Sequence, residues 1–242
     1  MSKYPRFFTG NSDFLDDKFY LKDPNLLRHA RKVLRLSKGD RIELFDGMGN
    51  TYKSEVVLLT KELLVAKIVE EIATEIKERK NVILAQALPK AGKIDSIVRM
   101  NTEIGVSKFL LFECDHSVVK IGHYHEGKIT RLKKIIQEAA RQSINNYIPQ
   151  IEVPITFEKL LEVDADIRII LDAKTESGVD IKDIKSKLKK NDTILLCIGP
   201  EGGFSKREIE AAMEKGFVLV KLDLPVLRTE TAGVVASAFL LL

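Results

Sequence analysis

The pattern of apolar and polar positions changes character near residue 75. Before that point the apolar runs are short, and residues 46–50 (DGMGN) are typical of a hairpin turn between two of them. The strand-like runs are 41–46, 51–59 and 63–69. They predict a small β domain, and we expect it to be a β-barrel. The polar segment 70–80 is the expected linker to the rest of the chain.

After residue 80, strand-like runs alternate with segments of helical periodicity. Strands are expected at 82–87, 109–112 and 167–171, and helices at 91–104 and 129–142. Such alternation predicts an α/β domain with a mostly parallel sheet. We therefore expect two domains, residues 1–72 and residues 73–242.

A continuous apolar run near the carboxyl end breaks in a glycine-rich loop. Residues 193–198 (TILLCI) read as a strand buried on both faces, and residues 199–205 (GPEGGFS) come directly after it. Gly202 and Gly203 tolerate a positive φ and leave space for a ligand to touch the main chain. A loop of this kind is often a phosphate cradle.

The chemistry of this loop argues against phosphate, however. Glu201 lies within it, and no lysine follows the glycines as in a P-loop. A neutral or cationic ligand held by backbone groups fits better, and a tight turn without any ligand is the alternative. Ser205, with Glu208 three residues later, predicts a capping box at the start of the next helix.

A second break comes after residues 218–222 (VLVKL), where Pro225 blocks continuation of the strand. Thr229 or Thr231 is expected to cap the next helix, with Glu230 in its first turn. That helix, 232–242, is apolar nearly all round and must be buried, either within the chain or with one face on another chain. Two breaks so close in sequence predict a pocket built largely from backbone.

Composition sets the broad class. The chain has 242 residues, 45% of them apolar and 31% charged, which describes a soluble globular protein with an ample core. The net charge of +4 is compatible with an anionic partner without requiring one. Cys114 and Cys197 each lie in or beside an apolar run and are expected to be buried, reduced thiols. With no signal segment and no apolar run of membrane-spanning length, we expect a cytoplasmic protein.

Basic residues concentrate at 28–38 and 120–134. Arg28, Arg31 and Arg35 can spread along a helix and follow phosphates, or they can form an ordinary solvated helix face. A small β domain carrying such a cluster beside a ligand-binding α/β domain favours RNA. No Cys or Asp/Glu set stands at a zinc-type spacing from the chain's histidines, so we reject a metal site. The absence of a Gly-x-Ser-x-Gly elbow and of a Walker lysine removes the usual support for a hydrolase or a kinase.

Five motifs along the chain resemble the bacterial 16S ribosomal RNA uridine-N3 methyltransferases of the SPOUT superfamily, and they stand in that family's order. They are TEIGV at 102–106, SVVK at 117–120, AARQS at 139–143, GPEGGFS at 199–205 and LRTETA at 227–232. Residues 29–40 also resemble that family's N-terminal PUA-like domain. The likeness covers nearly the whole chain.

The resemblance implies a trefoil-knotted, mostly parallel α/β domain after a small PUA-like β-barrel. It implies S-adenosylmethionine as methyl donor, no metal, a homodimer, and 16S ribosomal RNA or the small ribosomal subunit as partner. The predicted donor-binding residues are Leu171, Ile198, Gly199, Pro200, Glu201, Gly202, Gly203, Leu222, Leu227, Thr229, Thr231 and Ala232. The predicted RNA-binding residues are Arg28, His29, Arg31, Arg35, Lys38, His116, Lys120 and Gln142.

The expected chemistry is methylation of uracil N3, which becomes nucleophilic only when its proton leaves. We expect Arg228 to stabilise the anion that develops over O2, N3 and O4. Glu230 is expected to orient Arg228 or, as the weaker alternative, to accept the proton. The other catalytic task is to hold N3 in line with the methyl carbon.

Two positions depart from the family pattern. His116 stands where the family usually has an arginine before Ser-Val, and residues 144–146 (INN) stand where an arginine usually follows Gln-Ser. Both changes bear on the RNA target and not on the donor site. Two other functions stay open: a SPOUT enzyme acting on transfer RNA or another base, and an RNA-binding module without catalysis.

Overall fold

The computed structural model describes residues 4–9, 14–15, 17–72, 80–90, 92–173, 175 and 178–242. The chain divides into two compact units, Met1–Lys77 with Ala140–Ile148, and Glu78–Ala139 with Pro149–Leu242. The boundary predicted between residues 72 and 73 stays a prediction. Most of the expected linker, residues 73–79, lies outside the described residues, whereas residues 70–72 continue a strand.

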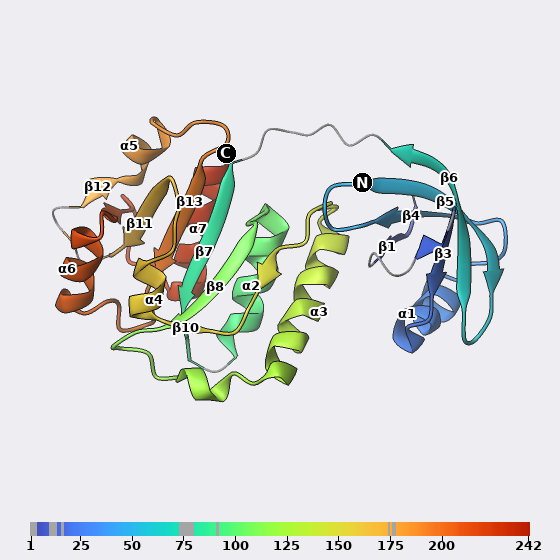
Figure 1. Ribbon diagram of the computed structural model, residues 1–242, viewed down its shortest axis with the longest axis horizontal. Helices are drawn as coiled ribbons and strands as arrows, with labels where there is room; N and C mark the ends of the chain where they lie inside the picture. Colours follow the sequence, from blue (N-terminus) through green and yellow to red (C-terminus); the bar gives the residue numbers. More distant parts are fainter. Residues whose placement is uncertain are drawn as a thin grey trace. The chain divides into compact units, whose positions relative to one another are not determined.

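The N-terminal unit is one curled sheet in the order β1-β4-β5-β6-β3-β2 (Figure 1). Its strands are β1 (Arg6–Phe8), β2 (Phe14–Leu15), β3 (Lys18–Leu21), β4 (Arg41–Phe45), β5 (Thr51–Leu59) and β6 (Leu64–Ile72). β1 pairs with β4 in parallel, and the remaining pairs are antiparallel. In the described part of the chain β1 and β2 form its two edges. Phe7, Phe19, Ile42 and Leu44 are buried in its core.

The basic segment of this unit is helical. Helix α1 (Pro24–Arg28) begins at Asp23, whose side chain accepts hydrogen bonds from the N–H groups of Asn25 and Leu26. A π-helix, η2 (His29–Val33), continues it, and Leu27 and Ala30 anchor the pair in the core. Arg28 and Arg31 are therefore exposed on this short helical segment, and Arg35 is exposed in the turn after it.

The second unit is built on an eight-stranded sheet in which every pair is parallel. This confirms the predicted α/β class. The strand order is β10-β8-β7-β13-β11-β14-β12, with β9 beside β8. The strands are β7 (Asn81–Ala87), β8 (Lys108–Glu113), β9 (Gln150–Ile151), β10 (Ile155–Thr156), β11 (Ile167–Leu171), β12 (Val179–Asp180), β13 (Thr193–Ile198) and β14 (Val218–Lys221).

The helices of this unit run between those strands. They are α2 (Lys93–Ile104), η3 (Ile121–His123), α3 (Glu126–Gln142), α4 (Phe157–Leu161), α5 (Ile181–Lys185), α6 (Lys206–Glu214) and α7 (Thr229–Leu241). Helix α7 packs on both α2 and β7 (Figure 1). Of the helices that the structure describes, none is long and apolar enough to cross a membrane.

The order of strands in this sheet positions the functional site. β13 lies between β7 and β11, and β14 lies beyond β11, so late segments of the chain are interleaved with early ones, as the expected knotted topology requires. In the sheet register Leu171 is level with Ile198 on one side and with Val220 on the other. The loops that leave β11, β13 and β14 consequently emerge side by side at the carboxyl edge, where parallel sheets bind ligands.

The C-terminal helix has two unlike faces. Gly233, Ala236, Ser237 and Leu240 are buried, which confirms that the helix packs into the core. Its remaining apolar side chains are only half-buried: Val234, Val235, Ala238, Phe239 and Leu241.

Both cysteines are free and buried, as predicted. Burial raises the pKa of the Cys114 thiol to about 11 and raises that of Cys197 further. Neither thiol is ionised at neutral pH, so neither serves as a nucleophile.

Candidate functional site

A cavity of about 480 Å³ opens at the carboxyl ends of β11, β13 and β14. It is lined by residues of the three loops 171–173, 198–203 and 222–229, together with Lys93 and Ala232. The sequence predicted that the two breaks near the carboxyl end fold around a hollow, and the structure brings them together around one.

A hydrogen bond from Thr229 joins the two breaks. Its Oγ1 donates to the carbonyl oxygen of Gly199 at 2.6 Å and accepts from Nε2 of the buried Gln86 at 2.9 Å. The Thr229 hydroxyl therefore uses its donor hydrogen bond to hold the Gly199 loop. It does not cap helix α7: the N-cap position is Arg228, with no side-chain cap hydrogen bond, so the predicted capping by Thr229 or Thr231 is wrong.

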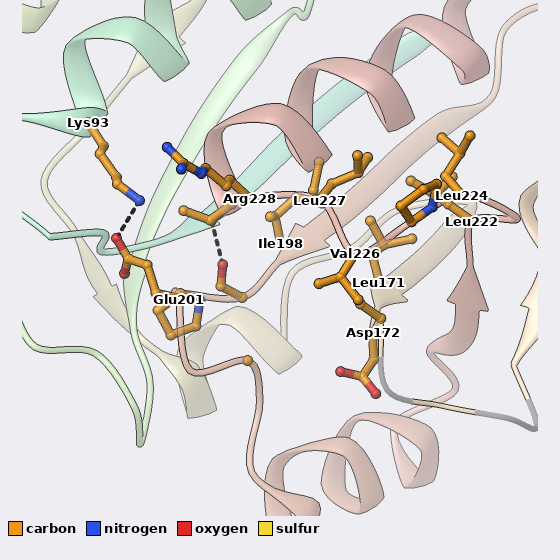
Figure 2. A pocket seen from close by; sticks show the side chains of 17 residues that line it. Lys93, Leu171, Asp172, Ile198, Glu201, Leu222, Leu224, Val226, Leu227 and Arg228 are labelled. Atoms are coloured by element: carbon orange, nitrogen blue, oxygen red, sulfur yellow. Dashed lines mark hydrogen bonds and ion pairs between the residues drawn. The ribbon is translucent and has the colours of Figure 1, made fainter.

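Lys93, the first residue of helix α2, links the two motifs a second time. Its Nζ lies 2.9 Å from Oε1 of Glu201 and 3.0 Å from Oε2 of Glu230. Figure 2 shows the ammonium group directed at the Glu201 carboxylate. The three side chains are only 20–29% exposed, so solvent screens the bridge less than it screens a surface ion pair.

The bridge shifts the pKa values of all three groups. Hydrogen bonds to Glu201 and Glu230 raise the pKa of Lys93. Burial alone raises the pKa of the Glu201 carboxyl, but hydrogen bonds from Lys93 and from backbone N–H groups outweigh it and lower that pKa. Burial also raises the pKa of the Glu230 carboxyl. A hydrogen bond from its own backbone N–H, the hydrogen bond from Lys93 and the charge of Arg228 outweigh burial, so the pKa of Glu230 is lowered. All three groups are charged at neutral pH.

The glycines of the 199–205 loop have different tasks. Gly203 has φ +73°, which other residues rarely adopt, and it lines the cavity. A Cβ on Gly199 would stand 3.2 Å from the Phe204 ring. Gly202 does not line the cavity: a Cβ there would meet that of His116 at 3.0 Å, so the missing side chain makes room for His116.

The helix after this loop begins as predicted. Ser205 and Glu208 form the capping box of α6, with both hydrogen bonds present. Asp115, in the loop after β8, accepts from Ser205 Oγ at 2.6 Å and from Arg207 Nη2 at 2.8 Å. The loop thus has firm anchors at its carboxyl end.

The cavity has a charged end and an apolar end. Figure 2 shows Lys93, Glu201 and Arg228 toward one end and the side chains of Leu171, Leu222, Leu224 and Val226 toward the other. Arg228 is exposed at the start of α7, and Asp172 places a nearly buried carboxylate among the lining residues. A ligand with an apolar flat part and a charged part matches this division.

Ten of the twelve predicted donor-binding residues line the cavity. They are Leu171, Ile198, Gly199, Pro200, Glu201, Gly203, Leu222, Leu227, Thr229 and Ala232. Gly202 packs under His116 instead, and Thr231 is exposed on helix α7. Their roles in binding stay predictions.

The predicted RNA-binding residues lie in several places. Arg28, His29, Arg31, Arg35 and Lys38 belong to the helical segment of the N-terminal unit and the turn after it, where Arg35 has φ +53°. In the second unit, His116 Nδ1 donates to the carbonyl oxygen of Gly203 at 3.0 Å, and Lys120 pairs with Glu113 at 3.1 Å. Gln142 is the last residue of α3.

Sequence reasoning missed six lining residues, of which Lys93 and Asp172 are the two charged ones. Each stands just beyond the carboxyl end of a parallel strand or in the helix after it, and that placement was the available signal. Neither belongs to a glycine-rich or threonine-rich motif. No group of three or more His, Cys, Asp or Glu side chains suited to a metal ion occurs among the described residues.

Comparison with known proteins gives a consistent result for both units. A family model described as an RNA methyltransferase domain matches residues 77–241, and one described as an RNA methyltransferase PUA domain matches residues 21–69. The ribosomal RNA small subunit methyltransferase E of Bacillus subtilis is 31% identical over 216 residues, which is 87% of this chain and 84% of that protein. The protein of that name from Buchnera aphidicola is 30% identical, covering 97% of this chain and 91% of its own length.

A solved structure agrees with these relatives. The ribosomal RNA small subunit methyltransferase E of Neisseria gonorrhoeae, bound to S-adenosyl methionine, has a TM-score of 0.82 at 26% identity, covering 97% of this chain and 95% of that one. The motifs, the parallel sheet with its interleaved strands, and matches over both units lead to one conclusion. The chain belongs to the RNA methyltransferase family that includes the ribosomal RNA small subunit methyltransferases E.

Proposed function

We propose that this protein transfers a methyl group from S-adenosylmethionine to N3 of one uridine in 16S ribosomal RNA of the small subunit. The observation that carries the proposal is the joining of the Gly199 loop and the Arg228 motif around one cavity, with the Arg228 guanidinium at its charged end. The named activity of the relatives supports the substrate class.

The cavity fits the donor. Its volume of about 480 Å³ lies within the roughly 300–1,000 Å³ range of small-molecule sites. The apolar end, lined by Leu171, Ile198 and Leu222, suits an adenine ring, and the carboxylates of Glu201 and Asp172 suit a ligand that carries positive charge and hydroxyl groups. When bound, the donor supplies an electrophilic methyl group with a good leaving group.

The residues of this chain then act on the uracil. Arg228, exposed at the mouth, donates to O2 or O4 and stabilises the anion that forms as N3 loses its proton to water. The target base reaches this mouth from a single-stranded loop or after unstacking. The rigid loops hold N3 near the methyl carbon, since Thr229 and Lys93 fasten one loop to the other.

Glu230 acts as a positioning residue and not as the proton acceptor. Its carboxylate is ionised, its pKa is lowered, and Lys93 occupies Oε2 at 3.0 Å. A general base at neutral pH works best with a pKa close to 7, so a carboxylate with a lowered pKa is poorly matched to that task. Its negative charge instead attracts the nearby Arg228 guanidinium.

The direct test is Arg228→Ala. We expect methyl transfer to fall by about 100-fold or more, because removing one oxyanion-type donor typically costs that much, while donor affinity changes little. Single-turnover methylation and calorimetric titration with S-adenosylmethionine measure the two quantities. Arg99→Ala, which removes an exposed guanidinium from α2, is the matched control. Turnover of the Arg228 variant within a few-fold of wild type would refute the assignment.

The RNA target needs a separate experiment. Ribosomal RNA from a strain lacking this protein should lack one 3-methyluridine, and the wild-type chain should restore it where Arg228→Ala does not. A missing modification in transfer RNA, or at another base, would replace the proposed target while leaving the chemistry intact. No heat in the titration with S-adenosylmethionine would favour a non-catalytic RNA-binding module.

We also propose a cytoplasmic homodimer with the half-buried face of α7 at its interface. Val234, Val235 and Leu241 give that face apolar area that this chain alone covers only partly. Sedimentation equilibrium tests the dimer, and Val235→Glu is expected to weaken it because burial of an unpaired carboxylate is costly.

A further inference from the structure

The second unit contains another cavity, of about 220 Å³, on the other side of the loop that leads into α2. One wall is lined by Pro89, Lys90, Gly92 and Ile94. The rest of the lining comes from residues 118, 119, 123 and 124 and from helix α3. The proposed methyl-donor site does not extend into this cavity. Its lining includes part of the 120–134 basic cluster recognised in the sequence.

The charged side chains of this wall all have the same sign. Lys90, Lys128 and Arg131 line the cavity, and its described lining contains no carboxylate. Asp95, next to the lining residue Ile94, is already engaged, since it accepts hydrogen bonds from both terminal nitrogens of Arg131, that from Nη2 at 2.8 Å. Of the three cations, Lys90 and Lys128 are therefore left without a carboxylate in the cavity lining.

Among these cations, Lys128 gives the strongest indication of an anion site. It is half-buried, it forms no ion pair with any described residue, and its Nζ lies 3.8 Å from the centroid of the Tyr124 ring. Tyr124 is itself buried, so the ring face holds the ammonium group in place. Burial and the neighbouring Arg131 charge lower the pKa of Lys128, and the charge of Asp95 offsets them only in part. An anion bound beside Lys128 would stabilise its positive charge.

The backbone at the start of helix α2 also favours an anion in this cavity. Helix α2 runs for twelve residues and starts at the cavity wall, with Gly92 at its N-cap and no side chain capping it. The backbone N–H groups and the helix dipole at such an end favour negative charge. At roughly 30 Å³ per water molecule, the cavity holds a phosphoryl group with a few waters.

The two cavities share one loop. Lys93 lines the first, its neighbours Gly92 and Ile94 line the second, and the backbone N–H of Lys90 donates to Glu201 Oε1 at 3.2 Å. The two cavities therefore both border the short segment 90–94.

We propose that this second cavity binds a backbone phosphate of the RNA close to the target nucleotide, with Lys128 as its principal contact. The inference rests on the proposed methylation of RNA and adds a site of contact in the methyltransferase unit. Phosphate contacts set the register of a nucleic acid on a protein, so this contact positions the target base without reading it.

The test uses Lys128→Gln in the full chain, with a single-stranded fragment of the methylated RNA as probe. We expect the dissociation constant for RNA to rise about 5- to 20-fold, and the slope of its logarithm against log salt to fall by about 0.7, the value for one phosphate contact on a single strand. Affinity for S-adenosylmethionine should stay unchanged, which also reports that the variant is folded. Lys128→Arg should retain most of the RNA affinity.

Lys133→Gln is the matched control, since it removes the same charge from an exposed position on the same helix, outside the cavity. If Lys128→Gln and Lys133→Gln weaken RNA binding equally, the effect is one of net charge and the phosphate site is refuted. Should Lys128→Gln fail to bind the donor, Lys90→Gln, at an exposed side chain of the same wall, takes its place with the same expected change in slope. If wild type itself neither binds nor methylates RNA, the proposed function fails first, and the two failures are therefore distinguishable.

Discussion

At the scale of single residues, the site depends on side chains that belong to other elements than the motifs they support. Lys93 starts the first helix of the α/β unit, yet its ammonium group holds the Glu201 carboxylate of the glycine-rich loop and the Glu230 carboxylate of the first turn of α7, both more than a hundred residues later. Without it, Glu201 and Glu230 place two negative charges side by side in a partly buried setting. Their repulsion would push the loops apart.

The replacement Lys93→Met keeps the apolar stem and removes the charge. We expect affinity for S-adenosylmethionine to fall about 5- to 150-fold, which corresponds to about 1–3 kcal/mol for leaving polar groups without their partner. Calorimetric titration measures it. Lys206→Met, at a side chain that is 91% exposed on α6, is the control and should bind the donor normally. Unchanged affinity in the Lys93 variant would show that the bridge has no part in shaping the cavity.

A second prediction at this scale concerns pH. Hydrogen bonds from Ser205 and then Arg207 lower the pKa of Asp115 below its ordinary value. The carboxylate therefore contributes stability that is fully present above its unfolded pKa of about 3.9 and is lost as the pH falls through the lower folded value.

We expect Asp115→Asn to lower the free energy of unfolding at pH 7 by about 1 kcal/mol, a modest figure because the side chain is partly exposed. Urea denaturation followed by circular dichroism checks this, because the chain has no tryptophan. The difference between variant and wild type should shrink steadily below about pH 4, where the carboxyl of the unfolded chain becomes protonated. A difference that stays constant throughout the acid range would mean that the charge of Asp115 is irrelevant to stability.

At the scale of elements, helix α7 couples the site to the core. Its first turn carries Arg228, Thr229 and Glu230, and its buried face packs on α2 and β7. Gly233 lies at this contact, and a Cβ placed there stands 3.6 Å from both Leu84 Cδ2 and Gln86 Oε1. That distance is ordinary van der Waals contact, so the glycine leaves room for one methyl group and no more.

Two substitutions at Gly233 should therefore act in opposite directions. Gly233→Ala is expected to stabilise the protein by about 0.5–1 kcal/mol, because alanine favours a helix interior and fits the space. Gly233→Val adds two more methyl groups against Leu84 and Gln86, and it should destabilise by about 1–3 kcal/mol. Urea denaturation compares the pair. Equal and strong destabilisation by both would show that α7 packs more tightly than the distances imply.

At the scale of the whole molecule, the two compact units are not two consecutive pieces of chain. Segment Ala140–Ile148 comes after most of α3 in sequence but groups with the N-terminal unit. There the Arg6 guanidinium connects it to the sheet: Nη2 donates to Asn146 Oδ1 at 2.5 Å, and Nε lies 2.6 Å from Glu43 Oε1. The Arg6 side chain is only 3% exposed and lies over the Phe45 ring.

We expect Arg6→Met to destabilise the protein by about 3–5 kcal/mol, because it removes the guanidinium that is paired with the largely buried Glu43 carboxylate. The double variant Arg6→Met with Glu43→Met should recover much of that loss, since both charges are then absent. Urea denaturation of the single and double variants completes the cycle. A single variant that costs less than about 1 kcal/mol, as an exposed pair does, would mean that water already reaches Glu43.

Periodicity and local motifs predicted much of this architecture. Alternating apolar runs predicted the β unit and the parallel sheet, and the capping box at Ser205 was correct because its two hydrogen bonds span only three residues. The capping of α7 was predicted wrongly because Thr229 has a stronger tertiary use, its hydrogen bond to Gly199 thirty residues away. Gly202 was misread for the same reason, since only the fold brings His116 against it.

The sequence by itself determined the class of fold and the two loops that form the cavity, because strand periodicity, glycine conformations and helix caps are local properties of the chain. Only the tertiary structure decided that Lys93 bridges those loops, that Asp172 joins them, and that a second, basic cavity lies beside the first. Those features arise where parallel strands distant in sequence end at one edge of a sheet. Which ends become neighbours depends on strand order, and no short stretch of sequence records that order.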